Sequence, residues 1–237
     1  MGRTRNTRDT DLQILGRLKA LAWLSASELK LLIRVLVFED FKRRQIIVQK
    51  AEPASEVHIL LTGIARITCM SAKGKRVTVA LLGAGPIPAF PPLPLSQFDF
   101  RYEAFRDCRV GSLGWNDFNG VSLHGADSAL RKFHENDAQQ WFRLLLRVSC
   151  FLNLDLHERV AHTLLELCSD FGIVESRGTL LSEFFSHNDI ADLVGATRPR
   201  VTEHLAQLER EELVVRQGRR LIVRVGELSK SVGAFTA

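Results

Sequence analysis

Two short amphipathic segments joined by a glycine, within residues 186–208, constrain the fold more than any other part of the chain. Ser186 stands where a helix N-cap belongs, and Asp189 places a carboxylate near the positive end of that helix. Gly195 then occupies the position where a left-handed residue ends a helix and turns the chain sharply. A second apolar stripe follows at steps of four and three, at Val201, Leu205 and Leu208. The pattern predicts a helix-turn-helix.

The sequence also predicts where the second helix starts. Thr197 is placed to cap it, and Pro199 falls in its first turn, where a missing N–H costs little. The face that we expect to be exposed is polar or charged: Arg198, Arg200, Thr202, Glu203 and Gln207. A plain helical hairpin with a solvated face would show the same pattern, so the next segment decides between the two interpretations.

Two apolar runs follow, at 213–215 and 221–225, separated by a basic tip at 216–220. They predict a β-hairpin wing in which Arg219 and Arg220 suit contacts with phosphates. The whole chain has 32 Lys and Arg against 27 Asp and Glu, a formal net charge of +5. Residues 196–224 hold seven arginines and four glutamates, so much of the basic excess lies here. We therefore expect double-stranded DNA as the partner.

The first half of the chain has a different pattern of residues. Residues 10–35 carry leucines at three-residue steps, and Ser25 with Glu28 forms a capping-box pattern, so this segment is expected to be helical. Runs rich in Val, Ile and Thr, punctuated by glycines, then predict an antiparallel barrel or sandwich over 37–115, with strands at 45–48, 57–61, 65–68 and 77–82. Five of the seven prolines fall within 86–94, which we interpret as a stiff loop rather than a central strand.

Residues 126–153 predict one long helix. An apolar stripe close to a heptad seam runs along it: Leu130, His134, Ala138, Trp141, Leu145, Val148 and Leu152. Asp155 is then an N-cap for a further helix over 156–169. The length of the first helix exceeds that of the usual globular helix, which favours a dimer seam or a spacer.

These segments together resemble the CRP/FNR family of bacterial transcription regulators over nearly the full length. Residues 192–198, followed by Val201, Thr202 and Leu205, resemble the recognition motif of that family. Residues 154–165 resemble its hinge, and residues 44–67 resemble its β-roll. The resemblance implies an α+β fold in three parts: an antiparallel β-roll (jelly roll) sensor over 1–125, a dimerisation helix and hinge over 126–154, and a winged helix-turn-helix over 155–237.

The resemblance further implies a homodimer that binds a palindromic operator with two recognition helices in successive major grooves and that contacts RNA polymerase. The base contacts of the family map onto Arg198, Pro199 and Glu203. Arg198 fits a guanine, and Glu203 either accepts from a cytosine or orients a neighbouring arginine. Pro199 replaces a polar residue, so we expect Arg200 to take part in the readout. The complete predicted interface is Ser186, Thr197, Arg198, Pro199, Arg200, Thr202, Glu203, Arg219 and Arg220.

The effector of the predicted sensor is left open. Family members that bind cyclic AMP use a Gly-Glu pair and an Arg-Ser or Arg-Thr pair, where this chain has Ala89-Phe90 and Phe98-Asp99. A phosphate would meet a phenyl ring and a carboxylate there, so we expect no cyclic AMP unless a shifted alignment brings in Arg101. The candidate pocket is Phe90, Phe98, Arg101, Tyr102 and Trp141. Haem, a cyclic dinucleotide, another apolar ligand, and a filled core in an effector-independent regulator are the alternatives.

The sequence lacks the motifs that are typical of other classes of protein. There is no phosphate-binding, dinucleotide, zinc-protease or nucleophile-elbow motif, so we expect no enzyme. The four cysteines form no C-x-x-C pair and none precedes Cys69, so we expect buried thiols and no metal or N-terminal cluster. Without a membrane-length apolar run or a signal-peptide core, the expected location is the cytoplasm. A β-roll interaction module without DNA binding is the alternative function.

Overall fold

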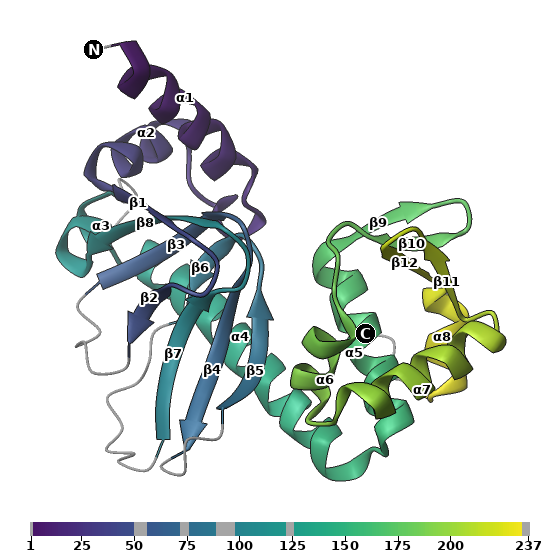
Figure 1. The fold of residues 1–237 in the computed structure, drawn as a ribbon. Coiled ribbons are helices and arrows are strands. Elements are labelled where there is room, and N and C mark those ends of the chain that lie inside the picture. The colour runs from purple at the N-terminus through teal and green to yellow at the C-terminus, as the bar shows by residue number, and fades with distance from the viewer. Residues whose placement is uncertain (1, 50–55, 72–75, 89–97, 122–125, 234–237) are drawn as a thin grey trace. The chain divides into compact units, whose positions relative to one another are not determined.

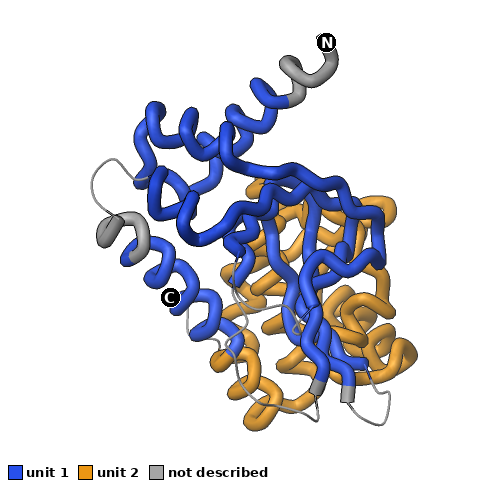
Figure 2. The backbone as a smooth tube through the Cα atoms, turned by 90° about the vertical axis from the view of Figure 1, so that its left-hand side faces the viewer, with its two compact units in different colours: residues 1–144 blue, residues 145–237 orange. Residues whose placement is uncertain are grey.

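The computed structural model describes residues 2–49, 56–71, 76–88, 98–121 and 126–233 (Figure 1). The chain forms two compact units, residues 1–144 and 145–237, which Figure 2 colours separately. The long helix α4 (Ala126–Asn153) is unbroken and contributes residues to both units. This confirms the helix expected over 126–153.

Two four-stranded sheets form the centre of unit 1. Their strands are β1 (Val37–Phe41), β2 (Ile46–Gln49), β3 (Glu56–Thr62), β4 (Ala65–Ser71), β5 (Arg76–Leu82), β6 (Gly85–Ile87), β7 (Phe98–Ala104) and β8 (Cys108–Gly114). The orders are β1-β8-β3-β6 and β2-β7-β4-β5, and neighbours pair antiparallel. The expected antiparallel β architecture is confirmed.

The core of the β-roll contains side chains from both sheets. Leu60 and Val110 come from the first sheet, and Ile67 and Tyr102 from the second, and all four are buried in one apolar cluster. The Tyr102 hydroxyl donates to the backbone oxygen of Pro88 at 2.6 Å, so this deeply buried polar atom is satisfied. Burial of this kind raises the pKa of Tyr102 above its usual range.

Helices cover the other face of the first sheet: α1 (Gly2–Arg17), a 3-10 turn (Lys19–Leu21), α2 (Ala26–Val35) and α3 (Trp115–Val121). Leu15, Leu18, Leu21 and Leu24 lie in their shared core, as the leucine spacing predicts. The helical character expected over 10–35 is confirmed, with a break after Arg17 and a new start at the predicted capping box of Ser25 and Glu28.

The proline-rich segment differs in part from the expectation of a loop. Pro86 lies in β6, paired with Ile59 of β3. β6 is an edge strand, where a missing N–H costs no ladder bond, so a proline is tolerated. Of the other four prolines, the structure describes Pro88. Pro91, Pro92 and Pro94 fall within 89–97, which lie outside the described residues.

Unit 2 joins the end of α4 to a helical core and a second sheet. Its elements are α5 (Leu156–Phe171), β9 (Gly172–Glu175), β10 (Gly178–Leu181), α6 (His187–Val194), α7 (Arg198–Arg210), β11 (Val214–Gln217), β12 (Arg220–Val223) and α8 (Val225–Ser231). The sheet order is β11-β12-β10-β9. Asp155 caps α5 in a reciprocal capping box with Glu158, as predicted. The α+β class is confirmed.

The expectation of buried thiols is confirmed for two of the four cysteines. Cys108 and Cys168 are buried, whereas Cys69 and Cys150 are half-buried, and all four are free thiols. Burial raises the pKa of Cys108 to about 11 and that of Cys168 to about 12, which makes both thiols poor nucleophiles at neutral pH.

None of the helices built from the described residues combines the length and the apolar character that crossing a bilayer requires.

Candidate DNA interface

The first helix of the motif, α6, begins at a complete capping box. The backbone N–H of Asp189 donates to Ser186 Oγ at 3.2 Å, and the Ser186 backbone N–H donates to Asp189 Oδ2 at 2.9 Å. The Ser186 hydroxyl also donates to Asp189 Oδ2, at 2.7 Å. The side chain of Ser186 is therefore engaged in holding the helix start.

The turn between α6 and α7 depends on Gly195. Its φ of 65° lies in the left-handed region that a side chain disfavours, as the sequence predicts. A Cβ added at this position would lie 3.0 Å from the ring of Phe151, at the end of α4. Glycine is thus required twice, once for the turn and once for the close approach of this aromatic ring.

The second helix, α7, begins after Thr197 and has Pro199 in its first turn, as predicted. Thr197 occupies the N-cap position, but its side chain makes no capping hydrogen bond, so the predicted side-chain cap is wrong. Val201, Leu205 and Leu208 are fully buried and fix the inner face. The helix is therefore held by packing and by the proline rather than by a capping hydroxyl.

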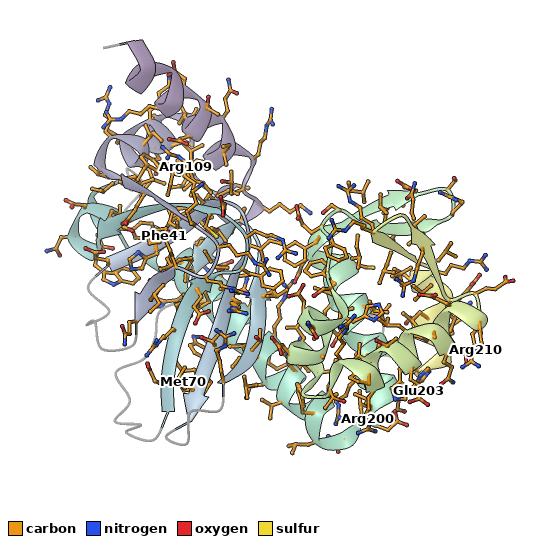
Figure 3. The ribbon with its side chains drawn as sticks, viewed as in Figure 1. Phe41, Met70, Arg109, Arg200, Glu203 and Arg210 are labelled. Atoms are coloured by element: carbon orange, nitrogen blue, oxygen red, sulfur yellow. The ribbon has the colours of Figure 1, made fainter. Side chains whose placement is uncertain are left out.

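The outer face of α7 carries the side chains that were predicted to contact DNA. Arg198, Pro199, Arg200, Thr202 and Glu203 are all exposed. Arg200, Glu203 and Arg210 lie along the outer side of the helix in Figure 3. Among the residues that the structure describes, Glu203 forms no ion pair with either Arg198 or Arg200. The two guanidinium groups are thus uncompensated and point to solvent, the state in which an arginine can pair with a guanine or a phosphate.

The wing confirms the predicted hairpin. β11 and β12 pair antiparallel, and Gly218 has φ 61° in the turn between them. Arg219 and Arg220 are exposed at this turn. The Arg219 guanidinium lies 4.5 Å from the centre of the Phe184 ring, a cation–π contact that restricts where the side chain can point.

Three residues outside the predicted interface connect these parts. His187, the first residue of α6, contacts Thr202 of α7 and Arg216 of β11. Arg216 also pairs with Glu209 of α7. Residues so far apart in the chain follow no periodicity, so only their type, a histidine and two charges within the motif, was visible in the sequence.

A buried arginine connects the end of α4 to the motif. Arg147 forms an ion pair with Glu166 of α5 and donates from Nη2 to the backbone oxygen of Leu193 at 2.6 Å. The Leu193 carbonyl lies in the last turn of α6, where helix carbonyls lack intrahelical partners. The guanidinium therefore caps α6 from the side of α4.

The stripe predicted as a dimer seam lies on a distinct face of α4. Leu144 packs into the β-roll core and Arg147 is buried in unit 2, while the residue after each, Leu145 and Val148, is about 100° further around the helix. Leu145, Val148 and Leu152 are 63%, 52% and 79% exposed. His134 and Ala138 are exposed and Trp141 is half-buried; the side chain of Leu130 is outside those that the structure describes.

The structure describes only part of the candidate effector pocket, and it separates two of its residues. Tyr102 points into the core between the sheets, while its neighbour Arg101 lies on the opposite face of β7 and pairs with Asp99. One pocket cannot contain both side chains, because successive residues of a strand face opposite sides. Phe90 lies outside the described residues, and so does the side chain of Phe98. Trp141 is half-buried on α4.

No group of three or more His, Cys, Asp or Glu side chains that could hold a metal ion occurs in the described part of the chain.

Comparisons with known proteins agree with this geometry. The family model of the cyclic nucleotide-binding domain matches residues 38–123, and that of the Crp-like helix-turn-helix domain matches residues 158–230. A global nitrogen regulator of Synechococcus elongatus is 26% identical over 191 residues, 79% of this chain and 86% of that protein. A CRP-like cAMP-activated global transcriptional regulator of Mycobacterium tuberculosis is 22% identical over 219 residues, 91% of this chain and 96% of that protein.

Solved structures have a similar fold. A solved structure of a CooA mutant from Carboxydothermus hydrogenoformans matches with a TM-score of 0.65 at 19% identity, covering 84% of this chain and 88% of that one. A cyclic nucleotide-binding-like β-roll followed by a Crp-like helix-turn-helix defines a DNA-binding transcription regulator and not an enzyme. The chain belongs to the CRP/FNR family of transcription regulators.

Proposed function

We propose that this regulator binds a palindromic operator as a homodimer paired through α4. The exposed apolar face of α4, Leu145, Val148 and Leu152, is the observation that carries the proposal. A second copy related by a two-fold axis presents the same stripe, so each face buries the other. Such a pair presents two α7 helices to half-sites about 34 Å apart.

The experiment replaces Leu145 and Leu152 together by glutamate and measures the mass in solution by sedimentation. We expect a dimer for the wild type and a monomer for the variant, because four carboxylates would be desolvated in the pair. The matched control is Val174→Glu on β9, which is 86% exposed and remote in sequence from α4. A monomeric wild type, or a dimeric double variant, contradicts the proposal.

Within the dimer, we assign base contacts to Arg198, Arg200, Thr202 and Glu203. The wing arginines, Arg219 and Arg220, contact phosphates. Pro199 packs against the DNA without hydrogen bonding. Ser186 and Thr197 lie at the starts of α6 and α7, where backbone N–H groups favour an anion.

Cyclic AMP is not the effector in this proposal, although the mycobacterial relative is named as activated by it. Asp99 and Arg101 pair with each other on one face of β7, and Tyr102 fills the other. Isothermal calorimetry of the full chain with cyclic AMP should give no binding heat. Absorbance spectra and native mass spectrometry of the purified protein then test haem, a cyclic dinucleotide, another retained ligand, and an effector-independent regulator.

We also propose that the DNA-bound dimer contacts RNA polymerase. The edge strand β9 exposes Ile173 and Val174, an apolar surface that a protein partner can cover. Transcription in vitro from a promoter bearing the operator should lose regulation in Val174→Glu while DNA binding is kept. We also propose the functional division expected from the sequence: a sensor over 1–125, a dimerisation helix and hinge over 126–154, and a DNA-binding domain over 155–237.

A further inference from the structure

A histidine with no assigned role lies where α6, α7 and β11 meet. His187 is half-buried. Its Nδ1 lies 2.7 Å from Oγ1 of Thr202 on the recognition helix α7, and its Nε2 lies 3.1 Å from Nη2 of Arg216 on the wing strand β11. One imidazole ring therefore contacts both DNA-binding elements, one through each nitrogen.

The neighbouring bonds determine which nitrogen carries the proton. The Arg216 guanidinium has only donors, so Nε2 must accept from it. The Thr202 hydroxyl donates its single proton to the backbone oxygen of Arg198 at 2.9 Å, so Nδ1–H must be the donor to Thr202. Arg216 is held from its other side by Glu209, which accepts from Nε at 2.7 Å. Arg216 thus donates to both Glu209 and His187, and the bonds continue from His187 through Thr202 to the Arg198 carbonyl, a network that requires a neutral imidazole protonated on Nδ1.

We propose that His187 is a positioning residue for DNA recognition, which in its neutral form locks the wing to the first half of the recognition helix. Thr202 and Arg198 belong to the part of α7 that carries the predicted base contacts. Arg216 belongs to the strand that leads into Arg219 at the wing tip. The chain of hydrogen bonds therefore fixes the base-reading side chains and the phosphate-contacting side chains as one surface.

Protonation of His187 breaks the hydrogen-bonded connection between α7 and the wing. A proton on Nε2 removes the acceptor and places a second cation against Arg216. Of the charged groups that face the ring, Arg216 and Arg198 oppose an imidazolium and Glu209 favours it. Burial first, then the charges of Arg216 and Arg198, lower the pKa of His187 below its ordinary value. The connection is therefore formed at neutral pH and is lost in acid.

Loss of this connection affects specificity more than total affinity. The added positive charge strengthens attraction to any phosphate backbone, whatever its sequence. The released recognition helix and wing no longer meet a half-site in one fixed arrangement, so the affinity for the correct sequence falls relative to a wrong one. The quantity that reports His187 is therefore the ratio of specific to non-specific affinity.

The experiment uses the full-length protein and two duplexes. One is selected from a random-sequence library by the wild type at neutral pH, and the other has the same base pairs in scrambled order. Fluorescence anisotropy gives both affinities from about pH 8 to about pH 5 at constant salt, because the pKa of His187 lies below that of an ordinary histidine. For the wild type, the ratio should fall about fivefold at the acid end, the factor expected for one net hydrogen bond.

Three variants separate positioning from general damage. His187→Gln keeps an acceptor for Arg216 that cannot be protonated, so its ratio should stay near the neutral wild-type value at every pH. His187→Ala should show the low ratio throughout. His162→Gln, on α5, is the matched control and should behave as the wild type. A His187→Gln protein with the wild-type pH profile, or a His187→Ala protein with the wild-type ratio, overturns the proposal.

A second readout does not depend on DNA. Nitrogen-15 spectra of histidine-labelled full-length protein report the tautomer of each imidazole, and the His187 signals are identified by their loss in His187→Gln. We expect the proton on Nδ1 at neutral pH. A proton on Nε2 overturns the proposal even if the alanine variant does not fold. Failure of the library selection would instead count against DNA recognition itself, and the tautomer still decides the role of His187.

Discussion

Replacing Arg147 by alanine tests how the winged helix-turn-helix is held to the end of α4. The guanidinium is buried, and it makes a charge-assisted bond of 2.6 Å to the Leu193 carbonyl in addition to its ion pair with Glu166. Alanine removes the packing of the long side chain and both polar contacts, one of which caps α6. We expect the free energy of unfolding to fall by about 2–4 kcal/mol.

The two polar contacts of Arg147 should not contribute equally. The side chain of Glu166 is 42% exposed, so water screens its attraction to the guanidinium. The Leu193 carbonyl bond is buried, and its loss leaves an acceptor without a partner. Glu166→Gln should therefore cost about 1 kcal/mol or less.

Urea unfolding followed by far-ultraviolet circular dichroism measures both variants, and hydrogen exchange of the amides of 187–196 locates the effect. In Arg147→Ala, exchange should accelerate in α6 and the turn after it, whereas α1 and the β-roll should be unchanged. A Glu166→Gln variant that is destabilised as much as Arg147→Ala would refute the reasoning, because the ion pair would then dominate.

Three further predictions concern the same unit. Gly195→Ala should cost about 1–3 kcal/mol in thermal unfolding, because the left-handed φ is strained and the new Cβ meets Phe151; a neutral result would show that Phe151 yields freely. Asp155→Ala should cost about 1 kcal/mol through loss of the α5 cap. The bond from the Glu158 backbone N–H is the first cause that lowers the pKa of Asp155, so the cap contributes above the ordinary aspartate pKa and is lost as pH falls through the lowered one. Wild type and variant should thus converge in stability in strong acid, and a constant difference would contradict the cap. Arg198→Ala should weaken binding to the selected duplex by about 1–3 kcal/mol and relax specificity at one base pair, whereas unchanged affinity in a mobility-shift assay would remove Arg198 from the readout.

The winged helix-turn-helix was predictable because its signals are local. The cap at Ser186, the left-handed Gly195 and the proline in the first turn of α7 each act within a few residues, and the structure has them in place. Strands β1, β7 and β8 had no such signal. Their charged residues are accommodated by partners distant in sequence: Arg109 of β8 pairs with Asp11 of α1, and Glu103 of β7 pairs with Arg66 of β4.

The candidate site shows the same limit. The outer face of α7 follows from helical periodicity, but the contacts of His187 span 15 and 29 residues and follow none. Two residues of the candidate effector pocket are separated for a simpler reason. Arg101 and Tyr102 are successive residues of β7, and the side chains of a strand alternate between its two faces.

Because α4 is unbroken, its length determines both how far apart its side chains lie and in which direction around the helix axis they point. Leu144 belongs to the packing of the β-roll, and Arg147, one turn later, belongs to unit 2. One residue inserted between them would turn the face of Leu145, Val148 and Leu152 by about 100° around the helix axis relative to Leu144 and lengthen the helix by about 1.5 Å. Seven inserted residues would nearly restore the direction of that face while adding about 10.5 Å.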